Sequence, residues 1–574
     1  MKGSAVLRFH AREARPLCGQ SVRGRSAALT FRARAGSLAP LLPDPIRMDL
    51  DIQILLIGAV LSAAMIFILW RIHRQNHPKA LWLLFFTEMW ERFSFYGMRA
   101  LLVLYMVKVM KVGDTAANLQ YGGYMALVYT MPLIGGWVAD NYLGSRKSIV
   151  LGGLLMAAGH LSLAVPLELF FYLGLGFLIS GNGFFKPNIS SFLGRFYETT
   201  DPRKDTAFSI FYLGINIGAF LGAGLCGYLG QKVDWHLGFG LAGAFMILGL
   251  VVFLLFRHLL GELGHPPRPR EPQPAHRWWI IFALSIVPLG ALLVKFYWIT
   301  GWLMPLMGIA AFAYVIWLGW KISAEMSADP ACGASPADRA GVARITRQKL
   351  WAALILMLGS VAFWGFFEQS GGAFNLMADR NVDLTVGDQK LQAAMINNNI
   401  NPAFIILLTP VFAWLWGALV RCRMEPSAPL KFGFSFLLMA AGYWMIVLGG
   451  KAAGGDGLMP LFWFIAAYFF MTASELCISP IGLSVVSKLS PARMTGLLMG
   501  MWFLATAFGH TLGGWIGTLM AVPGAKADGT PFTPPESLPI YTGVCWNITL
   551  VSLAGGLVLI LCAPLIKRWM HGVK

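Results

Sequence analysis

Long apolar runs separated by short polar connections occupy most of this chain. A membrane-spanning helix needs about 20 mainly apolar residues, and fifteen segments meet that criterion. These segments lie at 53–70, 80–110, 117–139, 147–165, 168–196, 207–230, 236–258, 278–299, 302–322, 350–376, 393–419, 430–450, 458–487, 494–522 and 541–566. So many runs of this length predict an all-α membrane protein that crosses the bilayer many times.

Composition supports this class. The chain has 574 residues, of which 57% are hydrophobic and 13% charged, and its mean hydropathy is +0.63; soluble domains carry about twice this charged fraction. A net charge of +18 would suggest nucleic-acid binding in a soluble protein. Here Lys and Arg cluster in short loops, so we expect no nucleic-acid partner. The seven cysteines show neither metal-ligand nor disulfide-framework spacing, so we expect no metal site.

The basic loops also predict orientation, because cytoplasmic loops carry an excess of Lys and Arg. The basic clusters fall at every second connection: 71–79, 146–147, 203–204, 257–277, 339–349, 421–431, 488–493 and 567–574. These loops and the C-terminus are therefore expected in the cytoplasm. We predict an integral plasma membrane protein, in a bacterial inner membrane, with lipid as a partner.

The helices divide into two sets of six. Residues 77–260 form an N-terminal bundle and 349–574 a C-terminal bundle, while 261–348 hold an inserted helix hairpin between Pro-rich linkers. Residues 48–76 form an extra N-terminal helix. Six plus six helices resemble the two halves of a major facilitator transporter, whose substrate binds at the midplane between the halves.

The basic tail, residues 1–47, disagrees with this orientation. It holds nine Lys/Arg against two Asp/Glu, and such a segment is costly to translocate. A start at Met48, followed by Asp49 and Asp51, would give a short acidic outside terminus. We hypothesise that Met48 is the biological start; the alternative is an Arg- and Ser-rich organellar transit sequence.

Charged residues interrupt the helix at 80–110. In "EMWERFSFYGMRALLVLYM", Glu88, Glu91 and Arg92 share one face and Arg99 lies about two turns farther on, with Tyr96 between. Intramembrane charges are rare and mark ion or substrate pathways. A carboxylate whose Arg partner can move away suits a conformation-dependent proton carrier. The alternative is a static ion cluster that joins helices.

Two further polar positions lie in the N-terminal half. Lys186 stands among aromatic residues before Pro187 in "GNGFFKPNISSFLGRFYE"; it either extends to the interface or binds an anion. Asn216 lies on a Gly-rich face of 207–230, where close helix packing with an interhelical hydrogen bond is the alternative to substrate binding.

The C-terminal half repeats an arrangement of polar and aromatic residues one helical turn apart. Its candidates are Trp364 with Glu368, Asn401 before Pro402, Glu475 with Ser479, and Trp502. We interpret them as the polar wall of a cavity with aromatic sides, although single aromatics are more often core or lipid-belt residues. The predicted spans hold four of these carboxylates and three of these cations. Such a near balance of charge suits a zwitterionic substrate.

Ordered motifs resemble the proton-dependent oligopeptide transporter family. "EMWERFSFYG" is similar to its ExxERFxYYG signature, and "FFKPNISSFLGRFY" and "FYLGINIGAFLG" are similar to its second signature region. "FEQSGGAFNL", "NPAFI", "SELCISPIGLS" and "MGMWFLATAFG" follow in family order, so the resemblance covers about residues 77–566. The inserted hairpin resembles the fourteen-helix bacterial members, whereas helix 53–70 lies outside that pattern.

The resemblance implies proton-driven uptake of di- and tripeptides by alternating access, in a protein that we expect to act as a monomer without a cofactor other than protons. It implies proton coupling by Glu88, Glu91, Arg92, Glu368 and Glu475. It implies peptide binding by Arg92, Tyr96, Tyr129, Lys186, Asn216, Trp364, Asn401, Glu475, Ser479 and Trp502. It implies gate pairs of Arg99 with Glu368 and of Lys186 with Glu475.

The sequence departs from the family pattern at three positions. Phe95 replaces the first signature Tyr, Gly122 stands where animal members have a pocket histidine, and Asn141 replaces the usual Arg after the loop residue Asp140. Both ExxER carboxylates are kept, which favours peptides over nitrate. The alternatives are a carrier of other zwitterionic or anionic molecules, such as modified peptides or nitrate, and a membrane-embedded enzyme such as an intramembrane protease, for which no HExxH or GxSxG motif is found.

Overall fold

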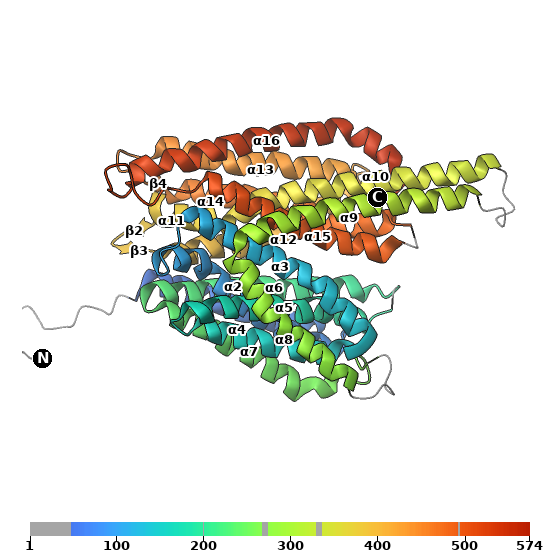
Figure 1. Cartoon of the computed structure of the whole chain (residues 1–574), viewed down its shortest axis with the longest axis horizontal. Helices are drawn as coiled ribbons and strands as arrows, with labels where there is room; N and C mark the ends of the chain where they lie inside the picture. The colour runs from blue at the N-terminus through green and yellow to red at the C-terminus, as the bar shows by residue number, and fades with distance from the viewer. Residues whose placement is uncertain (1–47, 199, 267–273, 329–335, 492–493, 574) are drawn as a thin grey trace, which may run out of the picture. The chain divides into compact units, whose positions relative to one another are not determined.

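The computed structural model describes residues 48–198, 200–266, 274–328, 336–491 and 494–573. Residues 49–574 form one compact unit, drawn in Figure 1 from blue to red along the chain. The tail 1–47, which we predicted to precede the biological start at Met48, lies outside the described residues.

The N-terminal half consists of long helices joined by short turns. They are α1 (Leu50–His73), α2 (Lys79–Lys108), α3 (Asp114–Val138), the π-helical turn η1 (Ala139–Leu143), α4 (Gly144–Leu163), α5 (Glu168–Gly194), α6 (Arg203–Lys232), α7 (Trp235–Phe256) and the 3₁₀ turn η2 (Arg257–Leu260). Asp234 caps the start of α7: its carboxylate accepts hydrogen bonds from the N–H groups of His236 and Leu237. The helices satisfy their own backbone groups, as a lipid environment requires.

The inserted hairpin and the C-terminal half follow. They comprise α8 (Pro274–Lys295), α9 (Tyr297–Ala328), α10 (Pro336–Phe367), the 3₁₀ turn η4 (Glu368–Ser370), α11 (Ala373–Asn381), β1 (Val382–Asp383), β2 (Thr385–Val386), β3 (Gln389–Lys390), α12 (Ala393–Arg421), α13 (Ala428–Ala452), β4 (Met459–Pro460), α14 (Leu461–Leu489), α15 (Thr495–Leu519) and α16 (Pro534–Trp569). The short strands pair as β1 with β4 in parallel and β2 with β3 as a hairpin.

The predicted all-α architecture is confirmed: long helices make up two sets, with an inserted hairpin between them and an extra N-terminal helix. Each of the fifteen predicted spans corresponds to a helix of 20 residues or more among the described residues. Eleven of these helical stretches are long and apolar enough to cross a membrane by length and composition alone. The four others, α2, α3, α4 and α15, are less apolar.

One predicted boundary is wrong. The span expected as 350–376 begins earlier, at Pro336, and breaks after Phe367. Gly371 and Gly372 cause the break, because glycine is a poor helix former and their N–H groups turn back to the Glu368 carbonyl at 3.1 and 3.3 Å. A side chain at Gly371 would overlap the Tyr121 hydroxyl and the Arg99 guanidinium. The break therefore lets another helix approach the chain at Glu368.

The two halves meet along two pairs of helices, α3 with α15 and α6 with α12. Within the N-terminal half α2 packs on α6 and α7, and α4 packs on α5; within the C-terminal half α13 packs on α14 and α16. The inserted hairpin bridges the halves, since α8 packs on α5 while α9 packs on α10 and α15 (Figure 1). These two contact lines place α2, α3 and α15 around the centre of the molecule.

The extra helix α1 lies along α6, with Gly58 against the Phe220 ring. Its N-terminal end contacts both halves. The Asp49 carboxylate pairs with Lys232 of α6 at 3.0 Å, and the Leu50 N–H donates to the Gln389 side chain of β3 at 2.5 Å. The helix that the resemblance left unexplained is therefore attached to both the N-terminal and the C-terminal half.

Candidate functional site

The ExxER residues form a sealed charged cluster on α2. Glu88, Glu91 and Arg92 are all buried. The Arg92 Nε lies 2.9 Å from Glu88 Oε1 and also contacts Glu91. The α6 backbone closes over them: a Cβ on Gly218 would lie 3.2 Å from the Arg92 Cβ. The expected single face of two carboxylates and one guanidinium is thus present, and all three side chains are buried.

The residue that replaces the first signature Tyr lies beside this cluster. Phe95 is buried, and its ring centroid lies 5.5 Å from the Arg92 guanidinium carbon, within the range of a cation–π contact. The ring therefore faces the guanidinium but supplies no hydroxyl. Tyr96, the next residue, lies 5.7 Å from the Arg99 guanidinium carbon by the same measure.

Lys186 approaches the cluster from α5. Its Nζ lies 3.8 Å from the ring centroid of Tyr129 on α3, and it interacts electrostatically with Glu88, Glu91 and Arg92. Within the described part of the chain, Lys186 makes no ion pair at 4.0 Å or less.

The predicted pair of Arg99 and Glu368 is formed across the two halves. Arg99 Nη2 donates to Glu368 Oε2 at 2.8 Å. The Tyr121 hydroxyl accepts from Arg99 Nε at 2.7 Å and donates to Glu368 Oε2 at 3.0 Å. All three side chains are buried. This three-residue network joins α2, α3 and η4; its role as a gate stays a prediction.

The predicted pair of Lys186 and Glu475 is not formed: no ion pair between them occurs among the residues described. Glu475 instead accepts from Asn401 Nδ2 at 3.0 Å, and Asn401 also donates to Thr472 at 3.1 Å. Asn216 donates to the carbonyl of Tyr212 on its own helix, at 2.9 Å. Glu475 and Asn401 therefore form a carboxylate and amide group on the C-terminal half.

Aromatic residues occupy the space between these polar groups. The Trp364 ring stacks near His510, with centroids 6.5 Å apart. Trp502 is buried against Gly482, where any larger residue would overlap its indole. Ser479 is half-buried on α14. These placements are compatible with the predicted pocket wall but do not assign a ligand to it.

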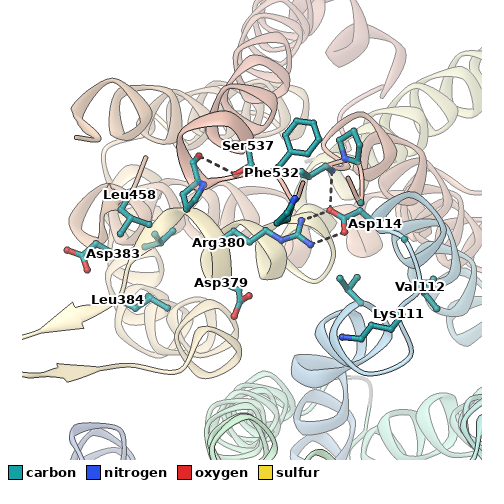
Figure 2. Close-up of a pocket in the computed structure, with 18 of the residues that line it drawn as sticks. Lys111, Val112, Asp114, Asp379, Arg380, Asp383, Leu384, Leu458, Phe532 and Ser537 are labelled. Carbon is teal, nitrogen blue, oxygen red and sulfur yellow. Dashed lines mark hydrogen bonds and ion pairs between the residues drawn. The ribbon is translucent and has the colours of Figure 1, made fainter. Parts of the chain in front are cut away.

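A further set of contacts joins the halves at the end of α2 and the start of α3. A cavity of about 690 Å³ lies there, and Lys111, Asp114, Asp379 and Arg380 are among the residues that line it (Figure 2). Arg380 makes a two-pronged ion pair with Asp114, at 2.5 and 3.0 Å, and Lys108 pairs with Asp379 at 2.5 Å. We call this the α3–α11 end of the molecule; the ion pairs hold the halves together at that end.

Sequence reasoning missed several members of these networks. Tyr121 and His510 stand in apolar helices, and Asp114 and Arg380 stand near loops, so no motif marked them. The only available signals were a polar residue within a span for Tyr121 and His510, and a helix-start carboxylate for Asp114. Asp140, whose predicted clamp lacks its usual Arg at Asn141, pairs with Arg195 at 3.0 Å.

The departure at Gly122 has a steric cause. A Cβ at this position would lie 2.7 Å from the Cα of Gly514 and 2.9 Å from the carbonyl oxygen of His510. Contacts this short do not occur for real side chains, so α3 and α15 meet backbone to backbone here. A histidine at position 122 could not be accommodated in this arrangement.

Two bundles of membrane-length helices around a buried, charged centre define a transporter of the major facilitator fold. The POT family model (PTR2) matches residues 146–325 and 334–531. The chain therefore belongs to the POT family, and the resemblance read from its motifs is confirmed.

Relatives match over nearly their whole length. The peptide transporter YePEPT of Yersinia enterocolitica subsp. palearctica is 33% identical, over 87% of this chain and 96% of the relative. The dipeptide and tripeptide permease B of Salmonella typhimurium is 31% identical, over 86% of this chain and 97% of the relative.

Solved structures agree with this assignment. A peptide transporter POT variant crystallised with alafosfalin has a TM-score of 0.71 and 35% identity, over 86% of this chain and 96% of that one. A POT family transporter in complex with 5-aminolevulinic acid has a TM-score of 0.70 and 27% identity, over 85% of this chain and 97% of that one.

Proposed function

We propose that this protein is a proton-coupled symporter that imports di- and tripeptides by alternating access. It works in a bacterial inner membrane as a monomer, needs no cofactor beyond the coupling protons, and catalyses no reaction. The names of the relatives, a dipeptide and tripeptide permease and a peptide transporter, support the peptide cargo.

The observation that carries the proposal is that two polar groups of opposite charge, the half-buried Lys186 and the buried Glu475, lie on different halves without an ion pair between them. Lys186 lies on the N-terminal half without an ion-pair partner among the described side chains, beside Tyr129. Glu475 lies on the C-terminal half with Asn401 as its hydrogen-bond partner. A peptide carries a carboxylate that suits Lys186 and an ammonium group that suits Glu475. A zwitterion could therefore bridge the halves.

Proton coupling rests on Glu368 and the ExxER carboxylates. The distribution of Lys and Arg orients the α3–α11 end outward, so the ion pair of Arg99 with Glu368 holds the outer side closed. A proton on Glu368 removes its charge and weakens that pair, which favours opening to the outside. Glu88 and Glu91 share Arg92, and protonation of either carboxylate leaves the guanidinium free for a peptide carboxylate.

Transport by the purified protein in proteoliposomes tests the proposal directly. Uptake of dialanine, trialanine, free alanine and nitrate is compared with and without an inward proton gradient. We expect gradient-driven accumulation of dialanine and trialanine only. Accumulation of nitrate instead would favour the alternative of an anion carrier, and peptide entry that ignores the gradient would refute proton coupling.

Two variants separate coupling from binding. Glu91→Gln should abolish accumulation under a pH gradient while sparing exchange of labelled for unlabelled peptide, and continued accumulation would exclude the coupling role. Lys186→Ala should weaken binding of dialanine more than that of dialanine amide, because only the former has the carboxylate that the ammonium would bind. Equal losses would refute this assignment.

A further inference from the structure

A buried histidine touches the network that joins the halves. His510 of α15 is 1% exposed, and its Nδ1 lies 3.4 Å from Glu368 Oε2. Its ring stacks on Tyr129 with centroids 4.5 Å apart and planes inclined by 36°. The Tyr129 ring also contacts the Lys186 ammonium. One histidine thus connects the Lys186 side of the site with the carboxylate bound by Arg99.

The position of the ring relative to Glu368 is fixed by the surrounding packing. The Gln369 side chain donates to the carbonyl of Gly513 at 2.8 Å and to that of Gly365 at 3.0 Å, which ties η4 to α15. A Cβ on Gly513 would lie 3.3 Å from the Glu368 Cβ, so glycine allows this close approach. His510 and Glu368 are therefore held as neighbours by the fold.

The environment of His510 differs from that of an ordinary core histidine. Neither ring nitrogen of His510 has a hydrogen-bond partner among the described residues, although buried polar groups are almost always bonded. Its Nδ1 instead faces the Glu368 carboxylate at 3.4 Å. The two groups form an ion pair when the imidazole is protonated. His160 is an internal comparison: it is equally buried and unbonded, but the described structure places no charged group against it.

The charged and titratable groups around His510 come from every side of α15. Tyr129 faces it from α3 and Glu368 from η4, while Arg99 of α2 and Tyr121 of α3 contact the same Glu368 oxygen. From α10 the neighbour is the uncharged Trp364 ring. Glu475 of α14 acts on Glu368 at longer range, and no titratable group of α9 contacts His510 among the described residues. A proton added to the pair of His510 and Glu368 therefore acts on contacts that join α2, α3, η4 and α15.

We propose that His510 is a proton-coupling residue of this transporter, which accepts the transported proton and competes with Arg99 for the Glu368 carboxylate. The inference rests on the proposed proton-coupled function. A proton from the outer side adds to the neutral imidazole, so that both ring nitrogens carry a hydrogen, and the Nδ1–H of the cation donates to Glu368 Oε2. The carboxylate then has three cationic or hydroxyl donors, Arg99 is held less tightly, and α2 can move away from η4. Release of the proton from the imidazole restores the pair with Arg99.

The test replaces His510 with Gln, which keeps a polar side chain of similar reach but does not titrate. The matched control is His160→Gln, which removes a buried histidine without a carboxylate neighbour. Gradient-driven dialanine uptake and dialanine exchange without a gradient are measured for the parent and both variants from pH 5 to pH 8. The expected result is an uptake-to-exchange ratio at least tenfold lower for His510→Gln, with the pH dependence of its uptake flattened, and parental behaviour for His160→Gln.

Each outcome has one meaning. If His510→Gln keeps the parental ratio and pH profile, the proposal is overturned while the proposed function stands. If the parent protein itself fails to accumulate dialanine, the proposed function fails instead. Equal losses in uptake and exchange would indicate a structural role and would also overturn the proposal. Should the Gln variant not fold, as judged by its melting curve, His510→Asn is measured in the same way, and proton influx accompanying dialanine is counted with an internal pH dye.

Discussion

Replacement of Gly122 by Ala tests whether the close contact of α3 with α15 belongs to only one conformation. The new Cβ would lie 2.7 Å from the Gly514 Cα and 3.0 Å from the Gly514 nitrogen. Carbon atoms in contact prefer about 3.5–4.0 Å, so the two helices must separate by about 1 Å. Both neighbours are backbone atoms, which cannot rotate away as a side chain can.

The magnitude follows from the cost of overpacking. One extra methyl group in a well-packed contact costs about 1–3 kcal/mol. Since α3 and α15 belong to different halves, the conformation in which they meet carries this cost, whereas a conformation open at the α3–α11 end does not. Each 1.4 kcal/mol changes a population ratio about tenfold, so the open form should gain between about 5-fold and about 140-fold.

Spin labels report this shift. We suggest labels at the exposed positions Thr115 of α3 and Leu519 of α15. In this protein Cys422 and Cys562, which are exposed or partly exposed, and also Cys18 and Cys332 are changed to Ser. Gly122→Ala should broaden the distance distribution toward longer values. Gly123→Ala is the control, because its Cβ would lie 3.3 Å from the Thr300 side chain of the hairpin and would not meet the backbone of α15. Identical distributions for the two variants would refute the reasoning.

Three further perturbations address the ionic contacts. Arg99→Met leaves the Glu368 carboxylate buried without its cation and should destabilise the closed form by about 3–5 kcal/mol; adding Glu368→Gln should recover part of this loss in a double-mutant cycle followed by spin-label distances. Asp114→Asn removes the charge that pairs with Arg380 and should destabilise the closed form by about 1–3 kcal/mol. This loss should appear as increased chemical labelling of the residues that line the cavity in Figure 2. Asp49 lies outside the membrane span. Burial raises its pKa, but the hydrogen bond from its lysine partner on α6, together with the other contacts of the carboxylate, outweighs this effect and leaves the pKa lowered. The ion pair therefore stabilises α1 above about pH 4, and this stabilisation is lost on acidification. Asp49→Asn should lower the melting temperature only slightly, because exposed pairs contribute about 0–1 kcal/mol, and should remove the difference between pH 7 and pH 3 due to this contact.

The helices were predictable because lipid imposes a simple requirement on the sequence. Every span must bury its backbone polar groups within one helix, so the apolar runs mark the helices whatever their tertiary neighbours are. The break at Glu368 was missed because the apolar run continues through Phe367, and only the glycines at 371 and 372 mark the turn. The linker after the hairpin was predicted to reach farther along the chain for a related reason. Polar residues extend α10 back to Pro336, before the start of its apolar run.

The site was predictable only where one helix carries its signal. Glu88, Glu91 and Arg92 are neighbours on α2, and helical spacing alone brings them together. Tyr121 and His510 reach Glu368 from α3 and α15, and helix packing decides such meetings. Nothing local in the sequence distinguishes His510 from His160, yet only the former faces a carboxylate.

The two predicted gate pairs differ in the structure, and the difference is what alternating access requires. Arg99 and Glu368 are in contact at 2.8 Å, while Lys186 and Glu475 are each engaged with other neighbours. If both pairs formed at full strength in one conformation, the transporter would be locked, because each pair would oppose opening at its own side. A carrier instead needs the second pair to form as the first is lost, so that the two open conformations differ by only a few kcal/mol. The pairing of Lys186 with Glu475 therefore stays a prediction for the conformation that is open at the α3–α11 end. A double-mutant cycle on this pair should show coupling in protein that Gly122→Ala biases toward that conformation. The parent protein should show little coupling.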